Sequence, residues 1–481
     1  PFFVFIKCLI YYFMKKTFLL LTLLLLTVQN QIFSQSIEGD WNGALNISGV
    51  QLRLIFHIEQ TENGLKGTMD SPDQGAKGLP VSTISFKNSI LMLSMKQIGM
   101  EYQGTLSGDS IIGKFTQMGA KLPLNLYRKA IEITTLIRSQ EPKKPYNYYV
   151  EEVTFKNTKD GNTLAGTLTL PNKTEKTPVV VLISGSGAQN RDEELMGHKP
   201  FLVIADYLTS NGIGVLRFDD RGTGSSTGDY NPATTADLAN DAEAAVAYLM
   251  TRNQVDKKNI GLIGHSEGGI IAPMVAAKNK NVAFIILLAG PGLRGDKLLG
   301  LQTVAVAKAN GASDELVERM LKFNKGSYEL VLNSNDKEKL KTDLENYLQK
   351  AFKENPNFAP GLSTEQLNSY IYTTVAQMTS PWMKYYIKYD PYTTLTKLKI
   401  PVLALNGAKD TQVAPKENLN AIRKAFDESG NKKLTTIELP NLNHLFQEST
   451  TGSPTEYPKI EQTFSPIALE QMNSWIHKQL K

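Results

Sequence analysis

The segment IGLIGHSEGG (residues 260–269) places a serine directly after a run of apolar residues, with a glycine two positions away on each side. Small residues such as Gly264 and Gly268 allow the chain to turn sharply from a strand into a helix. The spacing Gly-x-Ser-x-Gly is typical of a turn that presents a serine hydroxyl as a nucleophile. The same spacing also occurs in ordinary turns, so the assignment of Ser266 as a nucleophile depends on the rest of the chain.

Other short apolar segments rich in β-branched residues lie on both sides of this turn. They are VVVLIS (179–184), GVLRF (214–218), FIILLA (284–289) and PVLALNG (401–407). Continuous apolar runs of this length are typical of strands that are buried on both faces. Helical patterns separate most of them, including 234–252, for which we expect Thr235 as the N-cap. The alternation predicts a mostly parallel sheet with helices on both faces.

At 481 residues, the chain is long enough for two or three domains. Alternating polar and apolar residues in QLRLIFHIEQ (51–60), and further short runs up to Tyr127, predict an antiparallel all-β domain that we expect to be a packing or docking module, with ligand binding as the alternative. The segment 293–396 has helical composition, and it follows a strand of the sheet. We therefore expect a helical cap, with a capping box from Ser363 to Gln366, over the edge where such sheets bind ligands. The expected units are an extension with a signal peptide (1–35), the all-β domain (36–138), a linker (139–148), the first part of an α/β core (149–292), the cap (293–396) and the second part of the core (397–481).

The N-terminal segment has the pattern of an export signal. Met14 is followed by two lysines, by an apolar run and by small residues near Ser34, where we expect cleavage. We interpret the 13 residues before Met14 as an upstream extension. The alternative is a membrane anchor, which the shortness of the apolar run disfavours. The sequence therefore predicts an exported protein, periplasmic or extracellular, without stable membrane insertion.

The composition excludes several classes of function. Cys8 is the only cysteine and precedes the expected mature chain, so disulfides, thiolate metal sites and a cysteine nucleophile are not expected. The formal net charge is +5, of which Lys7, Lys15 and Lys16 supply three, leaving +2 on the expected mature chain. This balance does not suggest a nucleic-acid partner. We expect no metal and no organic cofactor, and the composition does not indicate an oligomeric state.

A serine nucleophile needs a histidine to accept its proton and a carboxylate to orient that histidine. Asp410 follows the strand segment PVLALNG, and His444 follows the next one, TTIELP (435–440). Both residues lie downstream of Ser266 in the order serine, acid, histidine. The sequence therefore predicts Ser266, Asp410 and His444 as a catalytic set.

From about residue 150 to residue 481, the chain resembles the α/β-hydrolases, and within them the secreted esterase and prolyl-oligopeptidase-like (serine aminopeptidase-like) branches. The resemblance depends on five motifs that occur in the family's order: LISGSG (182–187), RFDDRGTGSS (217–226), GHSEGG (264–269), NGAKD (406–410) and LNH (442–444). It implies the α/β-hydrolase fold, with Ser266 as nucleophile, His444 as general base and acid and Asp410 as the orienting acid.

The resemblance also implies an oxyanion hole made of two backbone N–H groups. One belongs to Glu267, directly after the nucleophile, and the other to the loop after VVVLIS, where Ser186 is the best match. Many relatives begin that loop with His-Gly, whereas this chain has Ser184-Gly185, so Gly187 remains an alternative donor.

Alternatives remain for the base and for the acid. His198 is the main competitor of His444, either as base or as a pocket residue, while His57, His265 and His477 are expected to serve other roles. Asp390 and Glu438 are the alternatives to Asp410. Two carboxylate–arginine groups, Asp219-Asp220-Arg221 and Arg191-Asp192, are expected to brace loops rather than to contact substrate.

The favoured function is hydrolysis of small-molecule carboxylic esters through an acyl-enzyme. A serine peptidase of the aminopeptidase or prolyl-peptidase type would use the same residues, but an aminopeptidase would need an acidic group in the cap to bind the substrate's ammonium. Cap carboxylates that could do so are Glu315, Glu318, Asp343 and Glu345, on helices that are expected to face solvent. A non-catalytic binding protein on the same scaffold is the third alternative.

Overall fold

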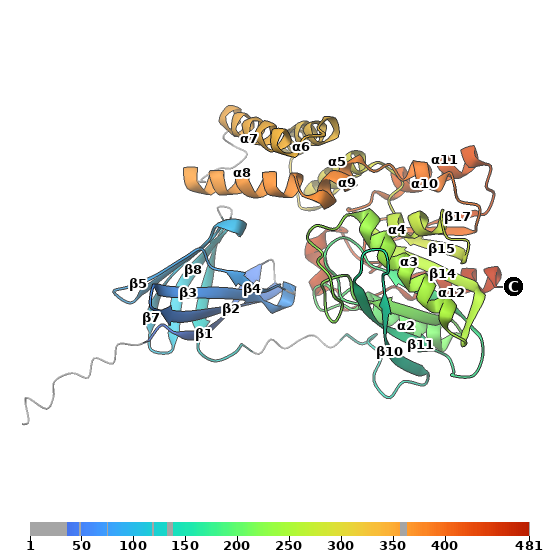
Figure 1. The fold of residues 1–481 in the computed structure, drawn as a ribbon. Coiled ribbons are helices and arrows are strands. Elements are labelled where there is room, and N and C mark those ends of the chain that lie inside the picture. The colour runs from blue at the N-terminus through green and yellow to red at the C-terminus, as the bar shows by residue number, and fades with distance from the viewer. Residues whose placement is uncertain are drawn as a thin grey trace, which may run out of the picture.

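The computed structural model describes residues 36–47, 50–74, 76–117, 120–131, 138–355 and 363–480. The expected N-terminal extension, the signal peptide and Cys8 lie outside these ranges. Within them, no helix is both long enough and apolar enough to cross a bilayer. Two sheets organise the described chain (Figure 1).

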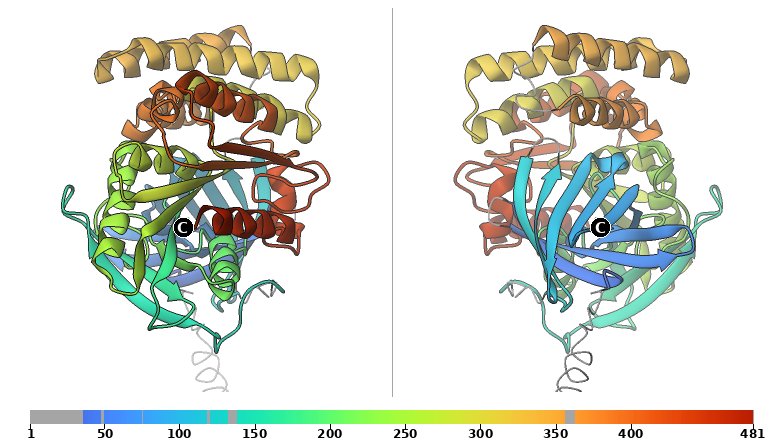
Figure 2. Two further views of the ribbon diagram at one scale, coloured as in Figure 1. Left: turned by 90° about the vertical axis from the view of Figure 1, so that its right-hand side faces the viewer. Right: turned by 90° about the vertical axis from the view of Figure 1, so that its left-hand side faces the viewer.

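The first sheet is antiparallel throughout and has nine strands in the order β4-β3-β2-β1-β9-β8-β7-β6-β5. Its edge strands, β4 and β5, follow each other in the chain, and β5 lies against β3, where a Cβ on Gly67 would be 2.9 Å from Cδ1 of Ile84, so the sheet curves into an almost closed barrel (Figure 2). The strands are β1 (Gly39–Ile47), β2 (Val50–Thr61), β3 (Gly64–Ser71), β4 (Ala76–Pro80), β5 (Thr83–Lys87), β6 (Ile90–Met95), β7 (Met100–Ser107), β8 (Ser110–Gln117) and β9 (Ala120–Tyr127).

Large side chains fill the inside of this barrel. The alternation in 51–60 does form a strand with one buried face, since Leu54, Phe56 and Ile58 are at most 3% exposed. Trp41 and Tyr102 are also buried in the same cluster. This cluster has the character of a packed core, and it supports the interpretation of the domain as a packing module rather than a ligand container.

The second sheet has eight strands in the order β10-β11-β13-β12-β14-β15-β16-β17. The first two strands form a hairpin and pair antiparallel, as does β11 with β13, whereas all later neighbours are parallel. The non-sequential order of β12 and β13 is that of a sheet wound with helices on both faces. The strands are β10 (Tyr149–Lys156), β11 (Thr163–Leu170), β12 (Thr177–Ile183), β13 (Gly214–Phe218), β14 (Val255–His265), β15 (Val282–Leu288), β16 (Val402–Gly407) and β17 (Leu434–Leu439). The expected α/β-hydrolase fold is confirmed, preceded by the expected antiparallel β domain.

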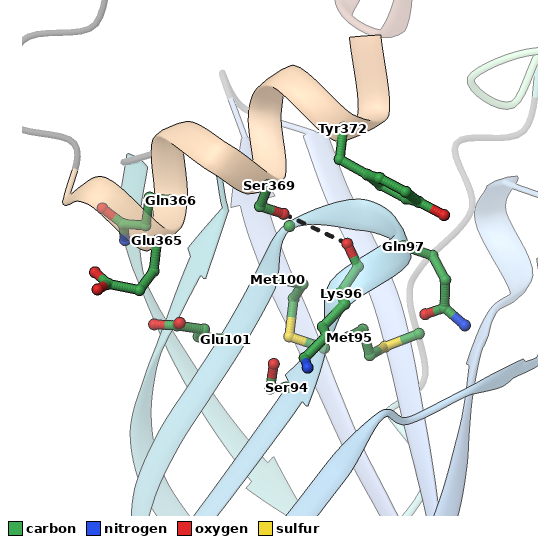
Figure 3. A pocket seen from close by; sticks show the side chains of 11 residues that line it. Ser94, Met95, Lys96, Gln97, Met100, Glu101, Glu365, Gln366, Ser369 and Tyr372 are labelled. Carbon is green, nitrogen blue, oxygen red and sulfur yellow. Dashed lines mark hydrogen bonds between the residues drawn. The ribbon is translucent and has the colours of Figure 1, made fainter. Parts of the chain in front are cut away.

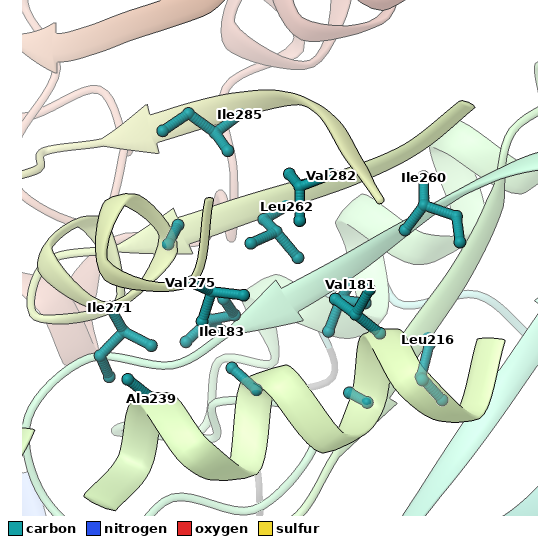
Figure 4. Close-up of a cluster of buried hydrophobic side chains, with 14 of the residues drawn as sticks. Val181, Ile183, Leu216, Ala239, Ile260, Leu262, Ile271, Val275, Val282 and Ile285 are labelled. Carbon is teal, nitrogen blue, oxygen red and sulfur yellow. The ribbon is translucent and has the colours of Figure 1, made fainter. Parts of the chain in front are cut away.

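Helices cover both faces of this sheet and bury an apolar core on each. On one face, α3 and α4 pack on Val181, Leu262 and Ile285 (Figure 4). On the other, α2 and α12 pack on a second cluster that includes Phe284 and Trp475. The covering helices are α2 (Pro200–Ser210), α3 (Thr235–Thr251), α4 (Gly268–Ala276), α11 (Pro415–Ser429) and α12 (Pro466–Gln479).

The expected N-cap of α3 was wrong by one residue. Thr234 is the N-cap, and it forms a capping box in which Asp237 returns a bond to the Thr234 backbone. The two adjacent threonines have equal capping chemistry, so the box partner three residues later decides between them. Thr235 instead begins the helix, with its side chain directed at the nucleophile turn.

Between β15 and β16 the chain forms a helical layer over the sheet (Figures 1 and 2). Its described helices are α5 (Gly295–Ala309), α6 (Asp314–Asn333), α7 (Lys337–Glu354), α8 (Thr364–Met378), α9 (Pro381–Lys388) and α10 (Tyr392–Leu395). The predicted capping box at Ser363 and Gln366 is confirmed at the start of α8. The helices of this cap bury their own apolar cluster, which includes Leu344, Leu348 and Ile387.

Candidate active site

Ser266 lies at the turn between β14 and α4, in a conformation that favours glycine. Its φ is +52°, and its N–H donates to the carbonyl of Leu288 at 2.9 Å. A Cβ atom on Gly264 would lie 1.9 Å from the carbonyl oxygen of Gly268, and one on Gly268 would lie 2.2 Å from that of Ile183. Both flanking glycines are therefore required by close backbone packing, and the strained serine between them has the geometry of a nucleophile turn.

Asp410 and His444 come from the loops that follow β16 and β17, and the structure brings them together. Nδ1 of His444 lies 2.8 Å from Oδ2 of Asp410, and both side chains are at most 4% exposed. The other oxygen, Oδ1, accepts the backbone N–H groups of Gln412 and Val413, each at 2.8 Å. The carboxylate is thus fixed, and it keeps the proton of His444 on Nδ1, which leaves Nε2 able to accept a proton.

His265, directly before the serine, positions the loop that carries His444. Its Nε2 donates to the backbone carbonyl of His444 at 3.0 Å, and the two rings lie 4.8 Å apart between centroids. Its Nδ1 is 2.9 Å from Oε1 of Glu193, so both ring nitrogens face acceptors. Burial favours the neutral ring, but the Glu193 carboxylate opposes it and the pKa of His265 is raised. We conclude that His265 is a buried imidazolium paired with Glu193.

Glu193 is a site residue that the sequence did not reveal. Besides His265, its Oε1 accepts the N–H of Gly185 at 2.7 Å, which ties it to the loop after β12. That loop lies beside Ser266, since a Cβ on Gly185 would be 3.2 Å from the Cβ of this serine. A glutamate within QNRDEE carries no local signal for this role, because its partners come from distant segments.

The two expected oxyanion donors are the ones whose N–H groups are left free. In the loop after β12, the N–H of Gly185 is bonded to Glu193 and that of Gly187 donates to the hydroxyl of Tyr230 at 3.0 Å. Within the described ranges, no hydrogen bond is recorded for the N–H of Ser186 or of Glu267. The arrangement thus favours Ser186 over the alternative Gly187.

The other histidines have structural surroundings. His198 is buried, with Nδ1 3.0 Å from the hydroxyl of Thr463 and Nε2 2.9 Å from the carbonyl of Tyr457, and burial lowers its pKa to about 4. His57 lies in the first sheet between two aspartates, and His477 bonds a carbonyl at the end of α2. None of the three contacts Asp410.

The alternative acids are also elsewhere. Asp390 accepts the N–H of Tyr392, the first residue of the short helix α10 (Tyr392–Leu395), at 3.1 Å, and Glu438 is exposed on β17. The arginines near these loops do brace them: Arg191 pairs with Asp219, Arg217 with Asp192, and Arg221 with Asp241 and Asp160.

Asp220 differs from its neighbours because no arginine pairs with it. Its Oδ1 is 3.0 Å from the Ser184 hydroxyl, and its Oδ2 accepts the N–H of Gln189 at 2.9 Å. Burial raises the pKa of Asp220 to about 8. The residue is therefore a neutral acid that holds the loop after β12.

The cap reaches the nucleophile turn through α9. The indole N–H of Trp382 donates to Oε1 of Glu267 at 2.8 Å, which places this helix over the residue after Ser266. The four cap carboxylates considered as ammonium anchors are exposed or half-exposed: Glu315 and Asp343 pair with residues on their own helices, Glu318 is exposed and Glu345 is half-exposed.

A cavity of about 440 Å³ opens elsewhere, between the barrel and α8 (Figure 3). It is lined by Met95, Lys96 and Met100 from the barrel and by Ser369 and Tyr372 from α8. None of the predicted catalytic residues lines it, so it is not the candidate active site. Among the described residues, no group of His, Cys, Asp and Glu side chains has an arrangement that could hold a metal ion.

The sheet order and the serine turn define an α/β-hydrolase. Residues 199–449 match the model of the family described as serine aminopeptidase, S33, and the chain belongs to this family. Esterase EstD of Thermotoga maritima is 27% identical over 321 residues, an alignment that covers 66% of this chain and 66% of the relative. This chain thus spans just under two thirds of that relative's length.

Solved structures with similar folds include an esterase of Pyrococcus furiosus and Est1E of Butyrivibrio proteoclasticus with ferulic acid bound. The first has a TM-score of 0.41 at 17% identity and covers 69% of this chain and 91% of its own. The second has a TM-score of 0.38 at 17% identity and covers 68% of this chain and 98% of its own.

Proposed function

We propose that the protein is a serine hydrolase that cleaves carboxylic esters through an acyl-enzyme, with Ser266 as nucleophile, His444 as general base and acid, and Asp410 as the orienting acid. Two observations carry this proposal together: the hydrogen bond of 2.8 Å between Asp410 and His444, and the turn in which Ser266 has a positive φ. A fixed carboxylate that sets the tautomer of a histidine is what a serine nucleophile requires.

In the proposed reaction, Nε2 of His444 takes the hydroxyl proton of Ser266 as the serine oxygen attacks the ester carbonyl. His444 then protonates the departing alcohol, and the same ring activates the water that hydrolyses the acyl-enzyme. Asp410 stabilises the imidazolium that forms in both steps, while its two backbone donors prevent the carboxylate from turning away.

The negative charge that develops on the carbonyl oxygen needs donors that are already in place. The unengaged N–H groups of Ser186 and Glu267 supply them, on the two loops that meet at Ser266. Preorganised donors of this kind avoid reorganisation during the reaction, and losing one typically costs about 10²–10³-fold in kcat.

An ester substrate is favoured over an aminoacyl peptide by the distribution of acidic groups. An aminopeptidase must hold the ammonium of its substrate, but the four candidate cap carboxylates are exposed or half-exposed, and Glu315 and Asp343 already pair with a basic residue on the same helix. Glu267 is buried under Trp382 and has no exposed surface. The name of the Thermotoga relative supports the same choice. A serine aminopeptidase is the second candidate, because the family model carries that description.

The test combines labelling with kinetics. A fluorophosphonate is expected to label the wild-type chain and not Ser266→Ala, while p-nitrophenyl esters of short acids are hydrolysed by the wild type and at least ~10³-fold more slowly by the variant. Ser85→Ala, an exposed serine of β5, is the matched control and should behave as wild type. If Ser266→Ala keeps its activity and its labelling, the proposal is wrong. If the folded wild type neither hydrolyses the esters nor is labelled, a non-catalytic role follows. A higher kcat/KM on aminoacyl anilides than on every ester would instead select the peptidase.

A further inference from the structure

Glu267 has a side chain that the proposed chemistry does not use. The reaction needs only its backbone N–H, yet its carboxyl group is completely buried. Oε1 accepts the hydroxyl of Thr235 at 2.6 Å and the indole N–H of Trp382 at 2.8 Å. Oε2 is buried with no hydrogen-bond partner. Neither donor to Oε1 is a cation.

This environment favours the neutral acid. Burial raises the pKa of Glu267, and hydrogen bonds from the side chains of Thr235, Trp382 and Ser186 only partly oppose the shift. An unpaired anion inside a protein is strongly disfavoured, whereas a protonated carboxyl group can accept a hydrogen bond from each of the two donors on one oxygen. Glu267 therefore acts as a buried hydrogen-bond acceptor whose donors are all neutral groups.

The two donors belong to different parts of the molecule. Thr235 is the first residue of α3, in the core, while Trp382 belongs to α9, in the cap. Glu267 itself is the N-cap of α4 and the neighbour of the proposed nucleophile. Trp382 stacks on Tyr386 with 5.0 Å between ring centroids, so its indole is held within α9. A single carboxyl group thus joins the core, the nucleophile turn and the cap.

The cap helix that Trp382 occupies is firmly attached to the rest of the cap. Gly295, at the start of α5, packs so closely on α9 that an added Cβ would lie 1.9 Å from the carbonyl oxygen of Tyr386. A displacement of α9 would consequently move α5 as well. Figure 1 shows α9 among the cap helices and above α4.

We propose that the side chain of Glu267 is a positioning residue, which through Trp382 fixes the cap over Ser266 and through Thr235 fixes the peptide that carries the oxyanion donor. This inference rests on the proposed function of the same site. The contact with the cap should govern substrate binding, and the contact with α3 should govern the chemical step.

The experiment measures kcat and KM separately for an ester substrate. Trp382→Phe keeps the ring and removes the donor, so we expect KM to rise about fivefold or more with kcat within twofold. Thr235→Val removes the other donor, and we expect kcat to fall about tenfold with little change in KM. Trp475→Phe, which removes an indole donor in α12 far from the cap, is the matched control and should leave both values unchanged.

Substitution of the acceptor itself gives the second arm. Glu267→Leu should combine both defects, and Glu267→Gln should restore KM and kcat to within about threefold, because an amide oxygen accepts the same two bonds without charge. In the Glu267→Leu background, Trp382→Phe should have no further effect on KM. If Glu267→Leu does not fold, the single variants of the two donors still decide.

The outcome that overturns the inference is distinct from failure of the proposed function. If Trp382→Phe and Thr235→Val leave kcat and KM unchanged while Ser266→Ala is inactive, Glu267 is not a positioning residue. The same holds if Glu267→Gln is as impaired as Glu267→Leu. Failure of fluorophosphonate to label Ser266 in the folded wild type would overturn the proposed function instead.

Discussion

The substitution Asp410→Asn tests the proposed histidine geometry with a change of very few atoms. Oδ1 of Asp410 accepts two backbone N–H groups at 2.8 Å, so in the variant the amide oxygen must stay at that position. The amide NH₂ then replaces Oδ2 and faces Nδ1 of His444, now 2.8 Å from a donor instead of an acceptor. The ring is thereby forced to carry its proton on Nε2, where it cannot accept the proton of Ser266.

The expected loss follows from this wrong tautomer. In serine hydrolases with this arrangement, the equivalent change lowers kcat about 10⁴-fold, which corresponds to about 5.5 kcal/mol of transition-state stabilisation. Folding should be little affected, because the amide is isosteric and keeps both backbone bonds. The variant also lacks the negative charge that stabilises the imidazolium formed during the reaction. Both defects act on the chemical step, so we expect the lost activity to be in kcat rather than in KM.

The assay is steady-state hydrolysis of a p-nitrophenyl ester, with circular dichroism to confirm folding. Asp390→Asn and Glu438→Gln are the matched controls, since these acids lie outside the site and should keep wild-type kcat. Retention of kcat within about tenfold of the wild type by folded Asp410→Asn would refute the tautomer argument. Loss of kcat in either control variant would point to a different acid.

Three further predictions concern stability. Gly264→Ala should prevent stable folding or cost several kcal/mol, because its Cβ would lie 1.9 Å from a backbone oxygen, whereas Gly300→Ala has free space in α5 and should stabilise by about 0.5–1 kcal/mol in urea denaturation. His265→Leu leaves Glu193 buried without its cation, so we expect a loss of about 3–5 kcal/mol and a smaller loss when both residues become leucine. If the double variant is the less stable one, the ion pair is not the cause. Asp220 has a folded-state pKa of about 8, so the wild type should lose stability relative to Asp220→Asn as pH rises from 4 to 8, by about 1.4 kcal/mol per pH unit. A difference in melting temperature between the two proteins that stays constant over this range would contradict that prediction.

The pattern of residues was sufficient to predict the second sheet and the order of the site residues along the chain. Because strands buried on both faces require continuous apolar sequence, the apolar segments match β12 to β16 to within two residues, except that β14 begins earlier, at Val255. The glycines at 264 and 268 indicated the turn at Ser266, since only glycine fits where backbones approach so closely. The expectation that Asp410 and His444 lie close together followed from the predicted sheet, because loops after parallel strands meet at one edge of the sheet.

The pairing of side chains, by contrast, became visible only in the folded chain. Glu193 lies 72 residues before His265, and neither local pattern nor charge indicates that they form a buried ion pair. Thr234 is the N-cap of α3 because Asp237 forms the capping box with it. The side chain of Thr235 is therefore available to bond Glu267.

The state of Glu267 is the clearest case. In the sequence it is an acidic residue beside the predicted nucleophile, and in the fold it is a buried acceptor with a raised pKa, bonded to Trp382, 115 positions away. Periodicity and spacing report which residues are buried and in what order they come. Hydrogen bonding and ionisation depend on partners that only folding brings within 3 Å, and those partners determine what each side chain can do.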